Sequence, residues 1–304
     1  MTLVVSVPTE SLASDLRPLP EGVEVIVWTM AEAAPRPRID IVVPPYMDQS
    51  DAFARLAEVE VGLVQGQSIG YEGVADRLPA GMRFANAATV HETSTAELAV
   101  ALTLAVQRQL DLFAINGRDG VWTPMFADSL ADRRVLLLGY GGVGKAVAAR
   151  LAPFEVELVP VASTARDEDG VHVHGIDELA DLLPGVDIVV LSLPGGERTR
   201  HILGEAELAA LPDGALVVNV GRGSLIDPDA LVRHTSAGRI RAALDVTEPE
   251  PLPSDHPLWN TPGVLISPHV GGASSAMRPR IAALLRRQIT HVLAGEQPEN
   301  VVLG

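Results

Sequence analysis

The sequence of 304 residues contains no cysteine. Disulfide bonds and thiolate metal sites are therefore excluded, and the composition agrees with a reducing, cytoplasmic setting. Only one of the 23 basic residues is a lysine, Lys145, so Schiff-base chemistry would depend on that residue alone. We expect no metal site.

The sequence has no long apolar runs, and we expect no targeting segment. The N-terminus, MTLVVSVPTE, has neither the basic segment nor the apolar core of a signal peptide, so we expect no export. The most apolar helical candidate, LAVALTLAV at 98–106, is far shorter than the roughly 20 residues that span a bilayer. A net charge of −16 repels nucleic acid and anionic membranes. We expect neither as a partner.

What the sequence does contain is a series of short β-branched runs between helical or polar stretches, which is typical of α/β proteins with parallel sheets. The length favours two domains. A long helix predicted over Thr95–Asn116 is apolar around much of its circumference, so we expect it between domains or subunits. A second helix is predicted over Met277–Ala294, folding back onto the first domain. The predicted strands are 3–7, 23–28, 39–43 and 61–65, then 135–139, 156–161, 186–194, 215–221, 242–246 and 264–269.

A glycine-rich motif, VLLLGYGGVGKAVAARL, places Gly139, Gly141 and Gly144 between a strand and a helix. Glycine there permits a tight turn, close approach of backbone NH groups to a pyrophosphate, and close helix packing. The motif therefore predicts a dinucleotide site. Gly139, Gly144 and Lys145 also fit the phosphate loop of nucleotide triphosphatases, but Ala146 stands where that loop needs Ser or Thr for magnesium. We rank that interpretation lower.

The end of the next strand indicates which dinucleotide binds. In NAD-binding units a carboxylate roughly 20 residues after the glycines binds the ribose hydroxyls. The corresponding position here is Ala162, followed by Ser163, Thr164 and Arg166. Two hydroxyls and a guanidinium suit a 2′-phosphate, so the segment predicts NADP rather than NAD. The acidic residues at 167–169 count against this prediction, because their charge repels an anion. The alternative interpretation is that this segment is an ordinary polar turn with no role in cofactor choice.

Three later motifs each place a charged or titratable residue just after an apolar strand. They are NVGRGSLID (219–227), ALDVTEPEPLP (243–253) and ISPHVGG (266–272). Since ligands of α/β sheets bind beyond the carboxyl ends of strands, we expect Arg222, Glu250 and His269 to converge. Histidine beside a carboxylate suits a general acid, and arginine suits a substrate carboxylate. Taken singly, each residue also has a purely structural interpretation: Arg222 as a surface cation, Glu250 as an acid in a proline-rich loop, and His269 as a loop histidine before a Gly-Gly turn. The other seven histidines receive no role.

These motifs, in this order and spacing, resemble the D-isomer-specific 2-hydroxyacid dehydrogenases, which include glyoxylate/hydroxypyruvate and phosphoglycerate dehydrogenases. The likeness covers Val61–Pro279 well. It implies an α/β fold of two Rossmann-like domains with doubly wound parallel sheets. A nucleotide-binding domain (94–277) would be inserted into a discontinuous flavodoxin-like substrate domain (1–93 and 278–304).

The resemblance also implies roles for residues. Arg222 would bind the substrate carboxylate and carbonyl, His269 would be the acid/base, and Glu250 would orient and tune it. In QGQSIGYEGV (65–74), the backbone of Ile69 and Gly70 would hold the substrate carboxylate. The expected cofactor contacts are Gly139, Gly141, Gly142, Val143, Gly144, Ser163, Thr164, Arg166, Pro194, Val220, Gly221, Asp245 and Gly271.

The expected function is hydride transfer between NADP, or NAD, and a small 2-oxo acid, with glyoxylate and hydroxypyruvate as default substrates. Selectivity would come from first-domain loops such as PPYMDQS (44–50). We expect a homodimer built on the helix at 95–116. A catalytically silent NAD(P)-sensing interaction protein of the same fold is the alternative. Departures from the family pattern are Ala162, Gly196 where members often carry Thr, and a shorter link from Arg222 to Glu250.

Overall fold

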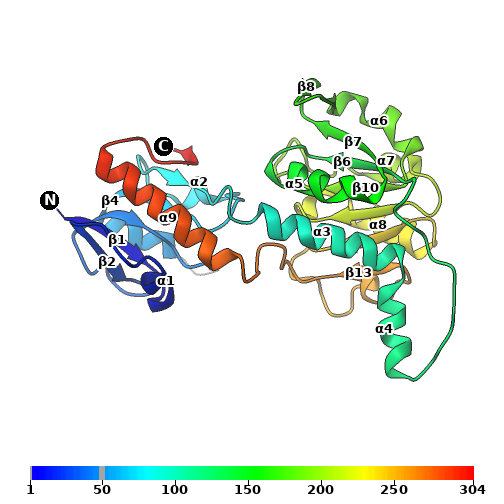
Figure 1. The fold of residues 1–304 in the computed structure, drawn as a ribbon, viewed down its shortest axis with the longest axis horizontal. Coiled ribbons are helices and arrows are strands. Elements are labelled where there is room, and N and C mark those ends of the chain that lie inside the picture. Colours follow the sequence, from blue (N-terminus) through cyan, green and yellow to red (C-terminus); the bar gives the residue numbers. More distant parts are fainter. Residues whose placement is uncertain (1, 48–51) are drawn as a thin grey trace. The chain divides into compact units, whose positions relative to one another are not determined.

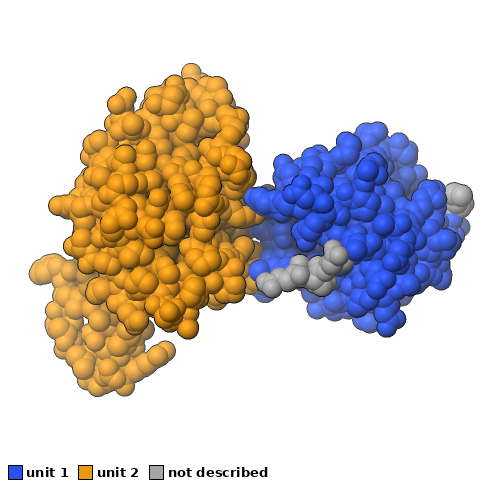
Figure 2. Space-filling view, turned by 180° about the vertical axis from the view of Figure 1, so that it is seen from behind, with its two compact units in different colours: residues 1–91, 274–304 blue, residues 92–273 orange. Residues whose placement is uncertain are grey.

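A computed structural model describes residues 2–47 and 52–304. The chain forms two compact units, 1–91 with 274–304 and 92–273 (Figures 1 and 2). The second unit is thus inserted into the first. The sequence placed the boundaries after 93 and 277, whereas the units divide just before helix α3, which begins at Glu92, and just before helix α9, which begins at Met277. Both units are built on mostly parallel sheets, which confirms the predicted fold class.

Unit 1 contains a six-stranded sheet in the order β14-β5-β4-β3-β1-β2. Its first five strands in the chain are parallel, and their order is that of flavodoxin-like folds. The short strand β5 and the antiparallel edge strand β14 were not predicted. The strands are β1 Leu3–Val7, β2 Val23–Val27, β3 Arg38–Val42, β4 Glu60–Gln65, β5 Phe84–Ala85 and β14 Val301–Leu303.

The predicted tail helix is confirmed as α9, Met277–Ala294, and it lies across the unit 1 sheet (Figure 1). Leu284 and Leu285 are buried there in the same hydrophobic core as Val5 and Leu12. Gln288 is fully buried and donates to the Gln65 side chain at 2.6 Å and to the Glu299 carbonyl at 2.8 Å. These bonds join α9 to β4 and to the C-terminal segment. The other unit 1 helices are α1 Glu10–Asp15, the 3-10 segment Ala52–Glu58 and α2 Val74–Arg77.

Unit 2 contains an eight-stranded sheet in the order β13-β12-β11-β10-β6-β7-β9-β8. Every strand pair is parallel except the β8–β9 hairpin at one edge. The central strands are apolar runs because helices cover both faces. The strands are β6 Arg134–Leu138, β7 Glu157–Ala162, β8 Arg166–Glu168, β9 Val171–Gly175, β10 Ile188–Leu191, β11 Leu216–Asn219, β12 Arg241–Leu244 and β13 Val264–Ile266.

Six of these strands were predicted, and the hairpin was not. Pro160 fits within β7 because β9 pairs with β7 only at Val161 and Ala162. Proline therefore stands where β7 has a neighbour on one side only. The unit 2 helices are α3 Glu92–Gln107, α4 Leu110–Arg118, α5 Gly142–Leu151, α6 Leu179–Leu182, α7 Glu205–Ala210 and α8 Pro228–Ser236, with 3-10 segments Ala152–Phe154, Ile176–Glu178, Leu183–Gly185, Gly223–Leu225 and Pro257–Asn260.

The prediction of one helix over Thr95–Asn116 is wrong. The chain bends by 67° between α3 and α4, and Gln109 adopts the left-handed conformation with φ of 55°. Helix α3 packs within the unit 2 core as far as Gln107, which is buried and accepts a hydrogen bond from Arg241 at 2.6 Å. Beyond that point α4 has no buried residue. The segment divides where its contact with the unit 2 core ends, and no helix-breaking residue marks that point.

Among the described residues, no helix taken singly has the length and apolar character to cross a membrane, while α3 and α4 pass that test only as a bent pair. The segment from α4 to 126 exposes a group of large apolar side chains. Trp122 is 94% exposed and Phe126 is fully exposed. The others are Leu110, Leu112, Phe113, Ile115, Val121 and Met125.

Candidate active site

The glycine motif forms the turn from β6 into α5, and each glycine has a different reason to be there. Gly139 has φ of 108°, a conformation that other residues rarely adopt. A Cβ on Gly144 would lie 1.9 Å from the Gly139 carbonyl oxygen, so only glycine fits. A Cβ on Gly141 would meet nothing within 4 Å. Open space thus lies beside the N-terminus of α5, where backbone NH groups favour an anion. The turn fits the pyrophosphate of a dinucleotide.

The turn lies where the strand order of the sheet reverses, between β6 and β10. Ligands of doubly wound sheets bind beyond the strand ends at this reversal. Ser192, just after β10, donates to the Gly139 carbonyl at 3.0 Å. Of the other expected cofactor contacts, Val220 and Gly221 are buried after β11, Pro194 is exposed after β10, and Val143 is half-buried on α5.

At the end of β7 the structure places Ala162 where the sequence predicted, with Ser163 and Thr164 exposed after it. Arg166 lies on β8 rather than in a loop, and its guanidinium binds Glu168 at 2.9 Å. The second Glu168 oxygen binds Lys145 of α5 at 2.5 Å. Lys145 and Arg166 hold the pKa of Glu168 below its usual value. Two cations therefore share one carboxylate here. Because Lys145 binds Glu168, its position gives no support to the interpretation of the glycine motif as a phosphate loop.

The structure brings Glu250 and His269 together beyond β12 and β13. His269 Nδ1 and Glu250 Oε1 are 2.5 Å apart, and both side chains are partly exposed. This hydrogen bond is the main reason that the pKa of His269 is raised, while burial and the charge of Arg222 oppose the rise. The same bond is the main reason that the pKa of Glu250 is lowered. The pair is arranged to keep the imidazole protonated beside a charged carboxylate.

His269 has φ of 52°, in the left-handed region that few residues other than glycine adopt. Asp245, only 3% exposed, holds the loop in this conformation. Its backbone carbonyl accepts from the His269 NH at 2.7 Å. Its carboxylate accepts from Ser267 Oγ at 2.6 Å, Val270 N at 2.9 Å and Gly271 N at 2.8 Å. Asp245, expected as a nicotinamide contact, is thus bonded to the loop that carries His269.

Arg222 stands in the loop after β11, and the buried Asn219 organises that loop. Asn219 accepts from Gly221 N at 3.0 Å and donates to the Arg222 carbonyl at 2.8 Å. A Cβ on Gly223 would lie 1.9 Å from the Thr247 carbonyl oxygen, so the loop packs directly on the chain leading to Glu250. Asn219 and Ser267 could not be singled out from the sequence, because their roles depend on contacts between separate segments. Glu168 was expected to oppose an anion, but its bonds to Lys145 and Arg166 were not predicted.

The expected carboxylate-binding loop lies in unit 1, just after β4. The Ile69 carbonyl accepts from Asn86 Nδ2 at 2.8 Å, which fixes the loop beside Gly70. In the PPYMDQS segment, Tyr46 stacks on His91 with ring centroids 5.8 Å apart. Residues 48–50 of that segment lie outside the described residues.

Replacing Gly144 by alanine is expected to lower the unfolding temperature of the protein and abolish dinucleotide binding, because the contact with the Gly139 backbone cannot be relieved by a side-chain rotation. Replacing Gly141 by alanine is expected to leave stability unchanged and still weaken binding, because the new methyl occupies the open space. Thermal unfolding and titration with NADPH measure both effects. Normal stability and binding in Gly144→Ala would contradict this account of the turn.

Comparisons with known proteins agree with this geometry. A protein named glyoxylate reductase from Korarchaeum cryptofilum is 31% identical, covering 94% of this chain and 92% of that protein. The crystal structure of a D-isomer specific 2-hydroxyacid dehydrogenase from Xanthobacter autotrophicus Py2, in complex with NADPH and MES, has a TM-score of 0.83 at 27% identity, covering 99% of this chain and 98% of that one.

A second crystal structure, of an NADPH-dependent glyoxylate/hydroxypyruvate reductase from Sinorhizobium meliloti in complex with NADP and malonate, has a TM-score of 0.80 at 26% identity. It covers 99% of this chain and 97% of that one. The family model for the NAD binding domain of D-isomer specific 2-hydroxyacid dehydrogenases matches residues 100–271. The chain therefore belongs to the NAD(P)-dependent D-isomer-specific 2-hydroxyacid dehydrogenase family.

Proposed function

We propose that the protein reduces a small 2-oxo acid to the D-2-hydroxy acid, with NADPH as the preferred reductant and glyoxylate or hydroxypyruvate as the substrate. The observation that carries this proposal is the 2.5 Å pair of His269 and Glu250 beside the charge of Arg222. The names of the relatives support the substrate class.

The glycine turn and the N-terminus of α5 would hold the cofactor pyrophosphate, and the residues after β10, β11 and β12 would border the nicotinamide. The bound reduced nicotinamide supplies the hydride that reaches the carbonyl carbon. The protein contributes position and charge, because holding two reactants in register removes much of the entropic cost of their encounter.

His269 supplies the proton. In the imidazolium both ring nitrogens carry hydrogen, and Glu250 binds the one on Nδ1. Nε2–H is left to protonate the carbonyl oxygen of the substrate. The ring becomes neutral as the alcohol forms, and a proton from solvent restores it. Glu250 fixes the orientation of the ring and keeps its pKa high, so that the acid form is present near neutral pH.

Arg222 would bind the substrate carboxylate through its guanidinium fork. Its Nη1 donates to the Gly221 carbonyl at 2.7 Å, which restrains the side chain. The charge of Arg222 reaches both members of the acid pair. The backbone of Ile69 and Gly70 is proposed to provide further hydrogen bonds to the carboxylate.

The preference for NADPH would arise because its 2′-phosphate replaces Glu168 as the ion-pair partner of Lys145 and Arg166. Lys145 and Arg166 lie beside the end of β7, where a 2′-phosphate of the adenosine ribose is expected. Glu168 neutralises part of their charge. A phosphate with nearly two negative charges would replace Glu168 as their partner, whereas the uncharged 2′-hydroxyl of NADH would not. Glu168 thus weakens NADPH binding without removing the preference.

A homodimer is the proposed assembly. Its support is the apolar surface of α4 and 119–126, which includes the almost fully exposed Trp122 and Phe126. Large apolar side chains exposed together on one segment are typical of interaction sites. A second copy of the same chain would cover it with the same surface in a two-fold arrangement.

Replacing His269 by glutamine is expected to lower kcat by about 10²–10⁴-fold, the usual contribution of a general acid, while leaving NADPH binding intact. Because reduction requires the imidazolium, the rate should fall as pH rises through the raised pKa of His269. Replacing Glu250 by glutamine removes the largest cause of that rise, so the alkaline limb of the pH–rate profile should move to lower pH. An unmoved limb in Glu250→Gln would contradict the assignment.

Replacing Arg166 by alanine is expected to weaken NADPH binding about tenfold, the effect of losing roughly 1.4 kcal/mol of charge-assisted hydrogen bonding, with little change for NADH. Replacing Glu168 by glutamine should strengthen NADPH binding, because both cations lose their competing partner. Arg55→Ala, which removes a similar exposed pair with Glu58, is the control. Equal effects on both cofactors would exclude Arg166 as the phosphate ligand.

Replacing both Trp122 and Phe126 by serine is expected to convert a dimer into a monomer, because the apolar surface that drives association is removed. Light scattering coupled to gel filtration measures the mass. Leu293→Ser, at an exposed apolar position on α9, is the control and should remain dimeric. A wild-type monomer, or a double variant that stays dimeric, would count against this surface.

A further inference from the structure

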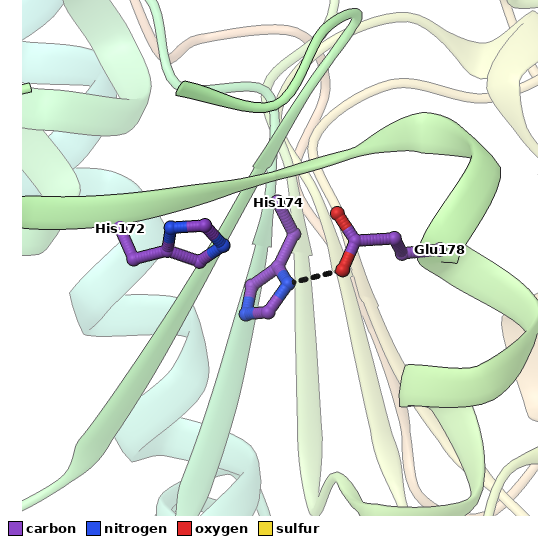
Figure 3. Close-up of side chains that lie close together, drawn as sticks. All are labelled: His172, His174 and Glu178. Atoms are coloured by element: carbon purple, nitrogen blue, oxygen red, sulfur yellow. Dashed lines mark hydrogen bonds and ion pairs between the residues drawn. The ribbon is translucent and has the colours of Figure 1, made fainter. Parts of the chain in front are cut away.

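The β8–β9 hairpin carries a second cluster of side chains that hydride transfer does not use. His172 and His174 are two residues apart on β9, so both imidazoles lie on the same face of the strand. Their rings meet edge to face with centroids 4.7 Å apart. Glu178, at the end of the 3-10 segment Ile176–Glu178 that follows β9, completes the group. Figure 3 shows His174 between the other two side chains. From the sequence alone these histidines have no expected role, and no metal site is expected.

We propose that His172, His174 and Glu178 bind a divalent transition-metal ion such as Zn²⁺. Their ligating atoms all lie within 4.8 Å of one another. His174 Nδ1 and Glu178 Oε2 are only 2.8 Å apart. Two ligands of a tetrahedral zinc ion, each about 2.0–2.2 Å from the metal, are separated by roughly 3.3–3.6 Å. Small rotations of partly exposed side chains bring the three groups to that spacing, with water as a fourth ligand.

Two further bonds prepare the donors. Asp167, opposite His172 on β8, binds His172 Nδ1 at 2.8 Å. A carboxylate on one ring nitrogen directs the other nitrogen to the metal, as in many zinc sites. Glu178 is fixed in turn by the Gly175 NH, which donates to its Oε1 at 2.8 Å. Asp167 thus orients His172, and the Gly175 NH orients Glu178.

The donor set selects the class of ion. Two imidazoles and one carboxylate suit Zn²⁺, Co²⁺, Ni²⁺ or Cu²⁺, whereas Mg²⁺ and Ca²⁺ prefer oxygen ligands alone. The net charge of −16 further favours a cation.

The metal site lies on the face of the hairpin opposite to Arg166, the proposed phosphate ligand. Arg166 pairs with the buried Val173, so both project from the face of the hairpin opposite to His172 and His174. The ion would join β9 to the turn at Glu178 and would touch none of Arg222, Glu250 and His269. Metal binding is therefore tested without reference to turnover.

The test is calorimetric titration of the full, tag-free and chelator-treated protein with ZnCl₂. One equivalent is expected to bind, and His172→Gln and His174→Gln should each weaken binding at least tenfold. His291→Gln is the matched control, because both of its ring nitrogens are hydrogen-bonded to carboxylates, those of Glu296 and Glu299. Co²⁺ should give the visible absorption of a four-coordinate site in the wild type and not in His174→Gln.

His172 is the more exposed ligand, so His172→Gln keeps the test valid if His174→Gln fails to fold. Circular dichroism checks the fold of each variant. Absence of saturable binding would overturn the proposal and leave the cluster as a hydrogen-bonded surface network. Equal binding in the wild type and both ligand variants, or loss only in His291→Gln, would overturn it as well.

Discussion

The buried carboxylate of Asp245 is the interaction on which the candidate active site depends. A buried carboxylate is costly unless several donors surround it, and here one hydroxyl and two backbone NH groups do so. All three donors come from the segment 267–271, so the charge at the end of β12 determines the path of the chain after β13. His269 acquires its left-handed backbone and its place beside Glu250 as a result. The local strain is compensated by hydrogen bonds made elsewhere in the same loop.

The two ends of the unit 2 sheet carry different electrostatic arrangements. Near β12 and β13, a carboxylate and an imidazole are paired so tightly that each stabilises the charge of the other. Near β7 and β8, one carboxylate is shared by two cations, in an arrangement that an incoming phosphate would match in charge. The region near β12 and β13 therefore suits proton transfer, and the region near β7 and β8 suits anion recognition. The proposed metal ligands project from the opposite face of the hairpin that carries Arg166.

Much of this arrangement was predictable because it depends on short-range patterns. Parallel strands buried on both faces read as apolar runs, and a glycine at position 144 signals a turn that no side chain fits. Arg222, Glu250 and His269 were predicted as site residues because each follows such a run, and the structure pairs two of them, Glu250 and His269. The break at Gln109 was not predictable, since no glycine or proline marks it and the cause is loss of core coverage beyond Gln107. The β8–β9 hairpin was missed because Arg166–Glu168 is charged throughout and has little strand propensity. The metal-site proposal was likewise out of reach, because it depends on the bond between His174 and Glu178 and on strand register.

The central claim is tested most directly by the initial rate of NADPH and NADH oxidation with glyoxylate and hydroxypyruvate. The account predicts turnover of at least one of these 2-oxo acids and a higher kcat/KM with NADPH than with NADH. Binding of both cofactors with no oxidation by either acid would contradict it and favour a protein of the same fold that senses the nucleotide without turning it over.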